Sequence, residues 1–196
     1  MAARKVKART LFETRVRASV LAEVDSALGD IPGAVDRAGA AAVNKTLAKM
    51  KTRTARGLAA HLTVKQANLR RRIFVVKATK SALFGSVKIM GRPIGLINFK
   101  TLDTKRTGVR YQIKKGGPVY EEPDTFIATG KFENRHVFAR LSSRRLPIAT
   151  QFSQRLYDLF NDSPVPADLE AWTPGELTSQ LRSQIDRFLA KPKRKR

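Results

Sequence analysis

The sequence predicts an α+β protein with two or three N-terminal helices, a central antiparallel sheet with a terminal hairpin, and a C-terminal helix. Apolar residues recur at helical spacing between residues 11 and 60, and again between 173 and 191. Between residues 73 and 141 the chain instead contains short β-branched and aromatic stretches, which glycine, proline and charged clusters separate. This second pattern is typical of an antiparallel meander of about five to seven strands.

The N-terminal third contains three helical patterns. Residues 11–28 place apolar side chains on one broad face, and the segment GDIPG at 29–33 interrupts that pattern. A second helix is predicted over 34–60, where four residues share an apolar stripe: Val43, Leu47, Met50 and Leu58. Thr63 and Gln66 then have the spacing of a capping box, which predicts the start of a short third helix.

The middle of the chain is predicted to form strands. The predicted strands are residues 73–79, 83–90, 94–99, 109–114, 125–129 and 136–141. The two longest connections, at 100–108 and 115–124, are expected to be loops.

Helical patterns return at the C-terminus. Residues 149–160 are helical by spacing, and the Pro-rich segment 161–172 is expected to be a connection. Thr173 then matches an N-cap, Pro174 the first helical position, and Glu176 the last position of a capping box. The sequence therefore predicts that the C-terminal helix begins at Thr173.

A length of 196 residues suits one domain. We expect a single α+β domain over 1–190, with a helical part at 1–72, the sheet at 73–150 and C-terminal helices at 151–190. The final segment KPKRKR, 191–196, is expected to be a basic tail that aids solubility or makes an electrostatic contact.

The charge of the chain is unusual. It has 39 Lys and Arg against 16 Asp and Glu, which gives a net charge of +23 and a pI near 11.2. The excess lies in the N-terminal and central parts, whereas residues 146–190 carry 3 basic and 6 acidic residues. Such a basic body indicates work close to a polyanion.

Two basic clusters are candidates for contact with DNA or with an acidic partner. One is a stripe on the predicted helix 34–60, formed by Lys45, Lys49, Arg53 and Arg56. The other is formed by Arg70, Arg71 and Arg72, at the end of the short third helix. A solvated face explains the stripe equally well, and the helix dipole favours cations in a last turn, so periodicity does not choose between these explanations.

Most signatures of enzymes and membrane proteins are missing from the sequence. There is no cysteine, no apolar run near the roughly 18 residues of a membrane span, and no apolar signal region. His61 and His136 lack metal-ligand spacing, and no phosphate-binding or nucleophile motif occurs, so we expect no catalytic residue, cofactor or metal.

One acidic pattern leaves a metal-dependent nuclease as a remote alternative. Glu121, Glu122 and Asp124, followed by Glu133 and Arg135, are similar to the P-D…E-x-K arrangement of metal-dependent nucleases. An arginine stands where that arrangement has lysine, and such short matches are frequent by chance.

The segment HVFARLSSRRLPI, residues 136–148, predicts a β-hairpin. Pro147 cannot donate to a strand ladder, so the return arm belongs at a sheet edge or at the first residues of a strand. Edges are usually blunted or paired with another chain, which motivates a subunit interface with Arg144 and Arg145 at its tip. The candidate interface residues are Val137, Phe138, Arg140, Arg144, Arg145, Leu146, Pro147 and Ile148.

The stretch PIGLINFKTLDTKRTGVRYQIKKGG, followed by DTFIATGKFENRHVFARLSSRRLPI, resembles the minor tail protein Z family of long-tailed bacteriophages. That family is similar in layout, with an A-x-N-K/R segment (here AAVNKT), a GV…IKKG strand and a V-F-x-R-x-x-x-x-R-L-P-I hairpin. The resemblance covers about residues 38–148. It departs from the family at KFENR, which separates Gly130 from His136, and at 149–152, where ATQF replaces a Gly-Pro. It does not extend beyond residue 161.

The resemblance implies a structural virion protein that completes the head-proximal end of the tail and helps join it to the head, without catalysis. Its expected partners are further copies of itself in a ring, expected to be sixfold, the tail terminator and tail tube proteins, neck proteins, and genomic DNA in the channel. No membrane is expected, and assembly is expected in the host cytoplasm. The alternative is a general basic nucleic-acid-binding protein without catalysis.

Overall fold

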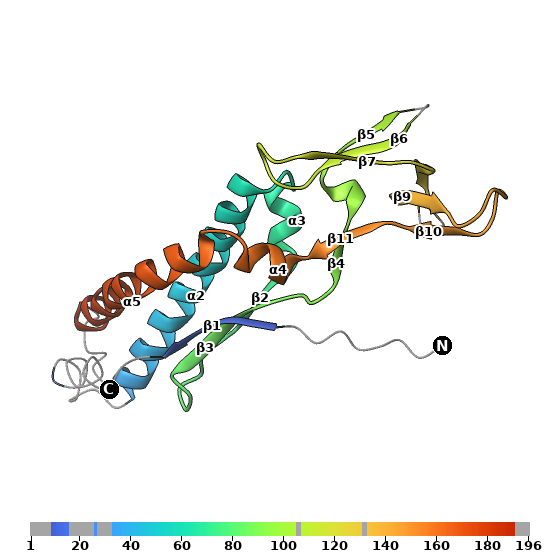
Figure 1. The fold of residues 1–196 in the computed structure, drawn as a ribbon. Helices are drawn as coiled ribbons and strands as arrows, with labels where there is room; N and C mark the ends of the chain where they lie inside the picture. Colours follow the sequence, from blue (N-terminus) through green and yellow to red (C-terminus); the bar gives the residue numbers. More distant parts are fainter. Residues whose placement is uncertain (1–8, 16–25, 27–32, 105–106, 131–132, 191–196) are drawn as a thin grey trace. The chain divides into compact units, whose positions relative to one another are not determined.

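The computed structural model describes residues 9–15, 26, 33–104, 107–130 and 133–190 (Figure 1). Helices combine with antiparallel sheets, which confirms the predicted α+β class. The described residues fall into two compact units, which we call unit 1 and unit 2. Unit 1 takes its residues from 55–72 and 90–163, and unit 2 from 9–54, 73–89 and 164–190. The predicted single domain over 1–190 stays a prediction, and the basic tail lies outside the described residues.

Unit 2 contains a three-stranded antiparallel sheet and two long helices. The strands are β1 (Arg9–Arg15), β2 (Ile73–Val76) and β3 (Phe84–Ile89), in the order β1-β3-β2. The helices are α5 (Val165–Leu189) and most of α2 (Ala34–His61), which confirms the helix predicted over 34–60. Apolar residues of the helices and the sheet are buried: Val43, Leu47, Met50, Ile73, Val87, Leu169 and Leu181.

The helix predicted over 11–28 is wrong at its start, because Arg9–Arg15 forms strand β1. Thr14 pairs with Gly85 of β3, and its side chain is buried. Threonine and phenylalanine favour strands, and a partner strand supplies hydrogen bonds that a short helix in water barely sustains. Apart from Ser26, the rest of the predicted helix lies outside the described residues.

Unit 1 divides the predicted central sheet into smaller antiparallel sheets. One has the order β5-β6-β7, with β5 (Lys100–Thr104), β6 (Gly108–Gln112) and β7 (Val119–Glu122). Another has the order β10-β9-β8, with β8 (Thr125–Thr129), β9 (Arg135–Arg140) and β10 (Ile148–Thr150). A third pairs β4 (Pro93–Gly95) with β11 (Phe152–Arg155).

Several predicted boundaries in unit 1 are wrong. Strands β5 and β7 occupy the stretches expected to be loops. The strand predicted over 94–99 ends in a 3-10 helix, η1 (Leu96–Asn98). The helix predicted over 149–160 is strand at first and becomes helix only at α4 (Leu156–Asn161). Pairing with β9 and β4 supplies backbone hydrogen bonds that local spacing does not reveal.

A small core holds the two three-stranded sheets of unit 1 together. Val109 of β6 and Val137 of β9 are buried with Leu96 of η1, and Ile127 and Tyr111 pack against them. A strand from each sheet therefore contributes to the same cluster, which fixes the base of the predicted hairpin.

The short third helix exists, but its predicted capping box does not form. Helix α3 (Gln66–Arg70) begins after Lys65, and no side chain caps it. The Thr63 hydroxyl instead donates to the carbonyl of Gln112 and accepts from the Lys100 N–H at 3.0 Å. Thr63 therefore joins the chain before α3 to β5 and β6, a tertiary role that replaces the cap.

Helix α5 begins at Val165, well before the predicted Thr173. Thr173 lies inside the helix, where its hydroxyl donates to the Leu169 carbonyl at 2.6 Å, and Pro174 follows it. Proline inside a helix removes one backbone donor, at a cost that neighbouring packing must offset. Val165 and Leu169 are buried, so the packed face of α5 starts ahead of the local cap signals.

Among the helices of the described residues, none has the length and apolar character that a membrane span requires.

Candidate functional site

The predicted hairpin is formed by β9 and β10. Phe138 pairs with Thr150, and Arg140 pairs with Ile148. β10 is an outer strand of its sheet, which agrees with the edge position expected from Pro147. The hairpin therefore presents a short strand edge together with the loop at its tip.

The loop at the tip, residues 141–147, joins β9 to β10 (Figure 1), and each of its residues is exposed. Leu141 and Leu146 are 63% and 65% exposed. The guanidinium groups of Arg144 and Arg145 form no hydrogen bond or ion pair with any residue that the structure describes. Exposed leucines beside two uncompensated arginines form a surface that suits a protein partner.

The base of the hairpin is held by its own unit. Val137 is only 1% exposed and belongs to the core. The ring of Phe138 lies 6.0 Å from that of Phe126, and the Arg140 guanidinium lies 5.1 Å above the Phe126 ring. Among the candidate interface residues, Val137 therefore supports the hairpin from inside, whereas the residues from Arg144 to Ile148 are available to a partner.

Part of the predicted basic stripe on α2 is already paired. Lys49 forms an ion pair with Glu176 of α5 at 2.6 Å. Arg53 donates two hydrogen bonds to the Asp168 carboxylate, at 2.8 and 2.7 Å, and its guanidinium lies 5.1 Å from the centre of the Trp172 ring. These contacts join α2 to α5 within unit 2, where the two helices lie side by side (Figure 1).

The other members of the stripe, Lys45 and Arg56, are exposed. Neither forms an ion pair with the described residues. The acidic C-terminal helix thus neutralises two of the four stripe positions, which periodicity does not reveal. Contact of Lys45 and Arg56 with DNA or an acidic partner stays a prediction.

The pairs between α2 and α5 shift the pKa values of their carboxyl groups. The hydrogen bonds from Arg53 hold the pKa of Asp168 below its ordinary value, and the bond to Asp168 raises the pKa of Arg53. Burial acts to raise the pKa of Glu176, but hydrogen bonds from Lys49 and Gln180 together outweigh it, so this pKa is also lowered.

We expect the substitution Asp168→Asn to lower stability at neutral pH but to have little effect in strong acid. The folded pKa of Asp168 lies below the unfolded value of about 3.9. Its stabilisation is therefore complete above about pH 5 and is lost as the pH falls through the folded pKa. Urea unfolding at neutral and at acidic pH measures the difference. Asp162→Asn is the control, because the exposed Asp162 forms no ion pair with the described residues; equal effects of both variants at neutral pH would contradict the expectation.

The second predicted basic cluster, Arg70 to Arg72, also contains both exposed residues and one with partners inside its unit. Arg70 and Arg71 are exposed. Arg72 is half-buried and donates to the backbone carbonyls of Arg92 and Pro93, at 3.5 and 3.3 Å, and burial lowers its pKa. Arg72 therefore has a structural role within unit 1, whereas partner contact by Arg70 and Arg71 stays a prediction.

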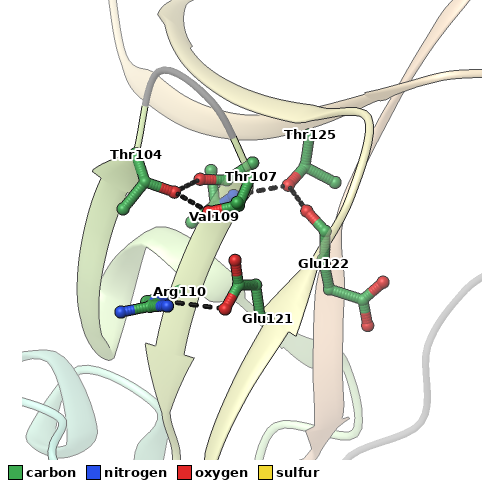
Figure 2. A network of polar contacts seen from close by, with 8 residues as sticks. Thr104, Thr107, Val109, Arg110, Glu121, Glu122 and Thr125 are labelled. Carbon is green, nitrogen blue, oxygen red and sulfur yellow. Dashed lines mark hydrogen bonds and ion pairs between the residues drawn. The ribbon is translucent and has the colours of Figure 1, made fainter.

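Two acidic residues of the nuclease-like pattern, Glu121 and Glu122, lie on β7 of the sheet β5-β6-β7 (Figure 2). Glu121 accepts a hydrogen bond from Arg110 on the neighbouring strand at 2.8 Å, and bonds from Thr107 and Arg110 lower its pKa. Glu122 accepts from the Tyr111 hydroxyl at 3.2 Å. The backbone carbonyl of Glu122 accepts from the Thr125 hydroxyl at 2.6 Å.

The two glutamates thus have cross-strand partners that account for their positions. No group of three or more His, Cys, Asp or Glu suited to a metal occurs within the described part of the chain.

Comparison with known protein families matches residues 26–191 to the family described as prophage minor tail protein Z (GPZ). The match spans more than half of the chain. The chain belongs to this family. It is therefore a phage minor tail protein, a component of the virion. Searches of curated proteins and of solved structures find no match.

Membership of the minor tail protein Z family extends further than the resemblance over 38–148. The match includes the C-terminal segment beyond residue 161, for which no resemblance was expected. Helix α5, with its ion pairs to α2, thus belongs to the region that the family shares.

The A-x-N-K segment of the family has a clear structural role in this chain. Asn44 lies on α2, and its amide group accepts from the Ala78 N–H at 2.8 Å and donates to the Ala78 carbonyl at 3.0 Å. Ala78 is buried just after strand β2, so both of its backbone groups depend on this side chain. The motif by itself does not indicate this role of Asn44, because its partner Ala78 lies 34 residues away in the sequence.

Proposed function

We propose that this minor tail protein completes the head-proximal end of the phage tail and helps join it to the head. It acts by assembly rather than by catalysis, as a ring of six copies around the DNA channel. The observation that carries the proposal is the β9–β10 hairpin: its V-F-x-R…R-L-P-I pattern over 137–148 resembles that of the family, and its tip, residues 141–147, is exposed.

A ring is supported by the surface that each copy presents. The tip exposes Leu141, Leu146 and two arginines without partners among the described residues, and β10 is an outer strand. In a head-to-tail ring, every copy offers such a surface to the next, so none remains open. Association also requires the chain's net charge of +23 to be balanced, by DNA in the channel or by acidic surfaces of tail terminator, tail tube or neck proteins.

Localisation in intact particles tests the proposal. Antibody labelling and electron microscopy should place the protein where the tail meets the head, and quantitative mass spectrometry should find six copies in each particle. Tails made without the protein should accumulate beside unjoined, filled heads. A position at the host-facing tip of the tail would contradict the proposal. Absence from particles, combined with tight DNA binding, would favour a nucleic-acid-binding protein instead.

The hairpin tip can be tested separately from localisation. Replacing Arg144 and Arg145 together with alanine is expected to weaken self-association by roughly 30-fold or more, because even one arginine at the centre of an interface often contributes about 2 kcal/mol. Sedimentation of the purified chain measures the change, and complementation of a phage that lacks the protein measures its consequence.

The matched control for the hairpin variant is the double substitution Lys77→Ala and Lys80→Ala, which removes the same charge from another exposed site. If both double variants associate like the wild type, the hairpin is not the interface. Equal weakening by both would show an effect of net charge alone.

A further inference from the structure

A hollow in unit 1 collects lysines that lie far apart in the sequence. Its volume is about 640 Å³, and its walls come from the start of α3, from η1, and from β5 and the end of β6. Lys65, Lys100 and Lys115 line it, and no carboxylate does. Three lysines from separate segments therefore line one concavity.

The hollow is built from fixed segments. Thr63 holds the Lys100 backbone N–H at 3.0 Å, and its own N–H donates to the Ile113 carbonyl at 3.0 Å. The Lys115 N–H donates to the His61 carbonyl at 2.8 Å, and the Lys115 ammonium donates to the Ala59 carbonyl at 2.7 Å. These bonds tie the end of α2, the start of β5 and the end of β6 together, so the segments that carry Lys100 and Lys115 are fixed before any ligand binds.

The floor of the hollow offers neutral polar groups. The Asn68 amide donates to the Asn98 side-chain oxygen at 3.1 Å, and Asn98 donates to the Gly95 carbonyl at 3.1 Å. Gln112 also lines the hollow and donates to the Gly117 carbonyl at 2.9 Å. Side-chain amides beside ammonium groups suit an oxygen-rich anion, because both groups can donate hydrogen bonds to its oxygens.

The charges of the hollow lack internal compensation. Lys65 and Lys100 are exposed and form no ion pair with the residues that the structure describes. Lys49, Arg53 and Arg72, which the sequence offered as anion contacts, are instead engaged inside their units. The hollow is thus a cationic surface whose lining contains no carboxylate to balance the lysines.

We propose that this hollow binds the phosphate groups of a nucleic acid backbone. The inference rests on the proposed position around the DNA channel, and it names the residues that contact the DNA. The contact is independent of base sequence, because ammonium groups read phosphate charge and not base edges.

Salt dependence of DNA binding tests the inference with the full-length chain. Each phosphate contact contributes about 0.9 to the slope of log K against log salt for duplex DNA. The triple variant Lys65→Gln, Lys100→Gln and Lys115→Gln should therefore reduce that slope by roughly 2 to 3. Fluorescence anisotropy of a labelled duplex across a salt series gives the slope, and circular dichroism checks that the variant is folded.

The matched control removes three exposed cations outside the hollow: Lys77→Gln, Lys80→Gln and Arg182→Gln. A wild-type salt slope in the hollow variant would overturn the inference. An equal loss of slope in the control variant would also overturn it, because it would show an effect of net charge alone. Competition by polyglutamate as strong as that by unlabelled DNA would overturn it in favour of an acidic protein. Should the triple variant unfold, the single variant Lys100→Glu gives the same comparison against Lys80→Glu.

This test separates the site from the proposed function. If the triple variant loses salt slope as expected but the protein lies away from the head-proximal end, the hollow binds DNA and the proposed function is wrong. If the protein lies at the head-proximal end but the triple variant keeps the wild-type salt slope, the proposed function stands and the hollow is not the DNA contact.

Discussion

Replacing Gly108 with alanine is expected to destabilise the chain by roughly 2 to 5 kcal/mol, a large part of the stability of a typical domain. Gly108 begins strand β6 with φ at +90°, a conformation that costs side chains about 1 to 2 kcal/mol. A Cβ there would lie 2.1 Å from the carbonyl oxygen of Glu122 on β7. Backbone cannot rotate away from this contact, so the β6–β7 pairing would have to shift. Urea unfolding measures the loss.

Gly116 provides the control for this prediction. It also has a positive φ, at +72°, but a Cβ there would meet nothing within 4 Å. Gly116→Ala should therefore cost only the conformational part, about 1 to 2 kcal/mol. If Gly108→Ala and Gly116→Ala unfold at the same urea concentration, the close approach of β7 contributes nothing.

The substitution Asn44→Ala is expected to cost roughly 2 to 6 kcal/mol, because each of two buried backbone groups left without a partner costs about 1 to 3 kcal/mol. Both the N–H and the carbonyl of Ala78 lose their hydrogen bonds in this variant. Ala78 is 6% exposed, so water replaces those bonds poorly. The midpoint of urea unfolding should fall accordingly, and amide hydrogen exchange at Ala78 should accelerate.

Asn161→Ala serves as the reference for Asn44→Ala. Asn161 is exposed at the end of α4, so its removal should leave the midpoint nearly unchanged. Asn44→Asp keeps the acceptor for the Ala78 N–H but places a carboxylate against the Ala78 carbonyl, and it should also destabilise. A stable Asn44→Asp variant would show that only one of the two bonds matters.

Long periodic segments and strong turn chemistry were predictable from the sequence. Helix α2 follows from a sustained 3.6-residue stripe, which few other structures can satisfy. The β9–β10 hairpin follows from its alternation and from Pro147, whose missing N–H restricts it to an edge.

Predictions that rested on cap signals were wrong. Thr63 and Thr173 both matched capping boxes, yet one bonds across unit 1 and the other lies inside α5. A cap contributes only about 1 kcal/mol, whereas burying Val165 and Leu169 contributes about 1.5 to 3 kcal/mol for each side chain. Packing therefore starts helix α5 ahead of the local cap signal at Thr173.

The amino-acid sequence was enough to predict the α+β class, the family, the basic character and the hairpin with two arginines at its tip. Each of these depends on local pattern, on the order of motifs along the chain or on composition, which the sequence reveals directly. The tertiary structure alone decided which cations remain available. It pairs Lys49 and Arg53 with the acidic helix α5, and it gathers Lys65, Lys100 and Lys115 from three separate segments. Periodicity describes one element at a time, whereas an anion site depends on the charges that several elements bring together.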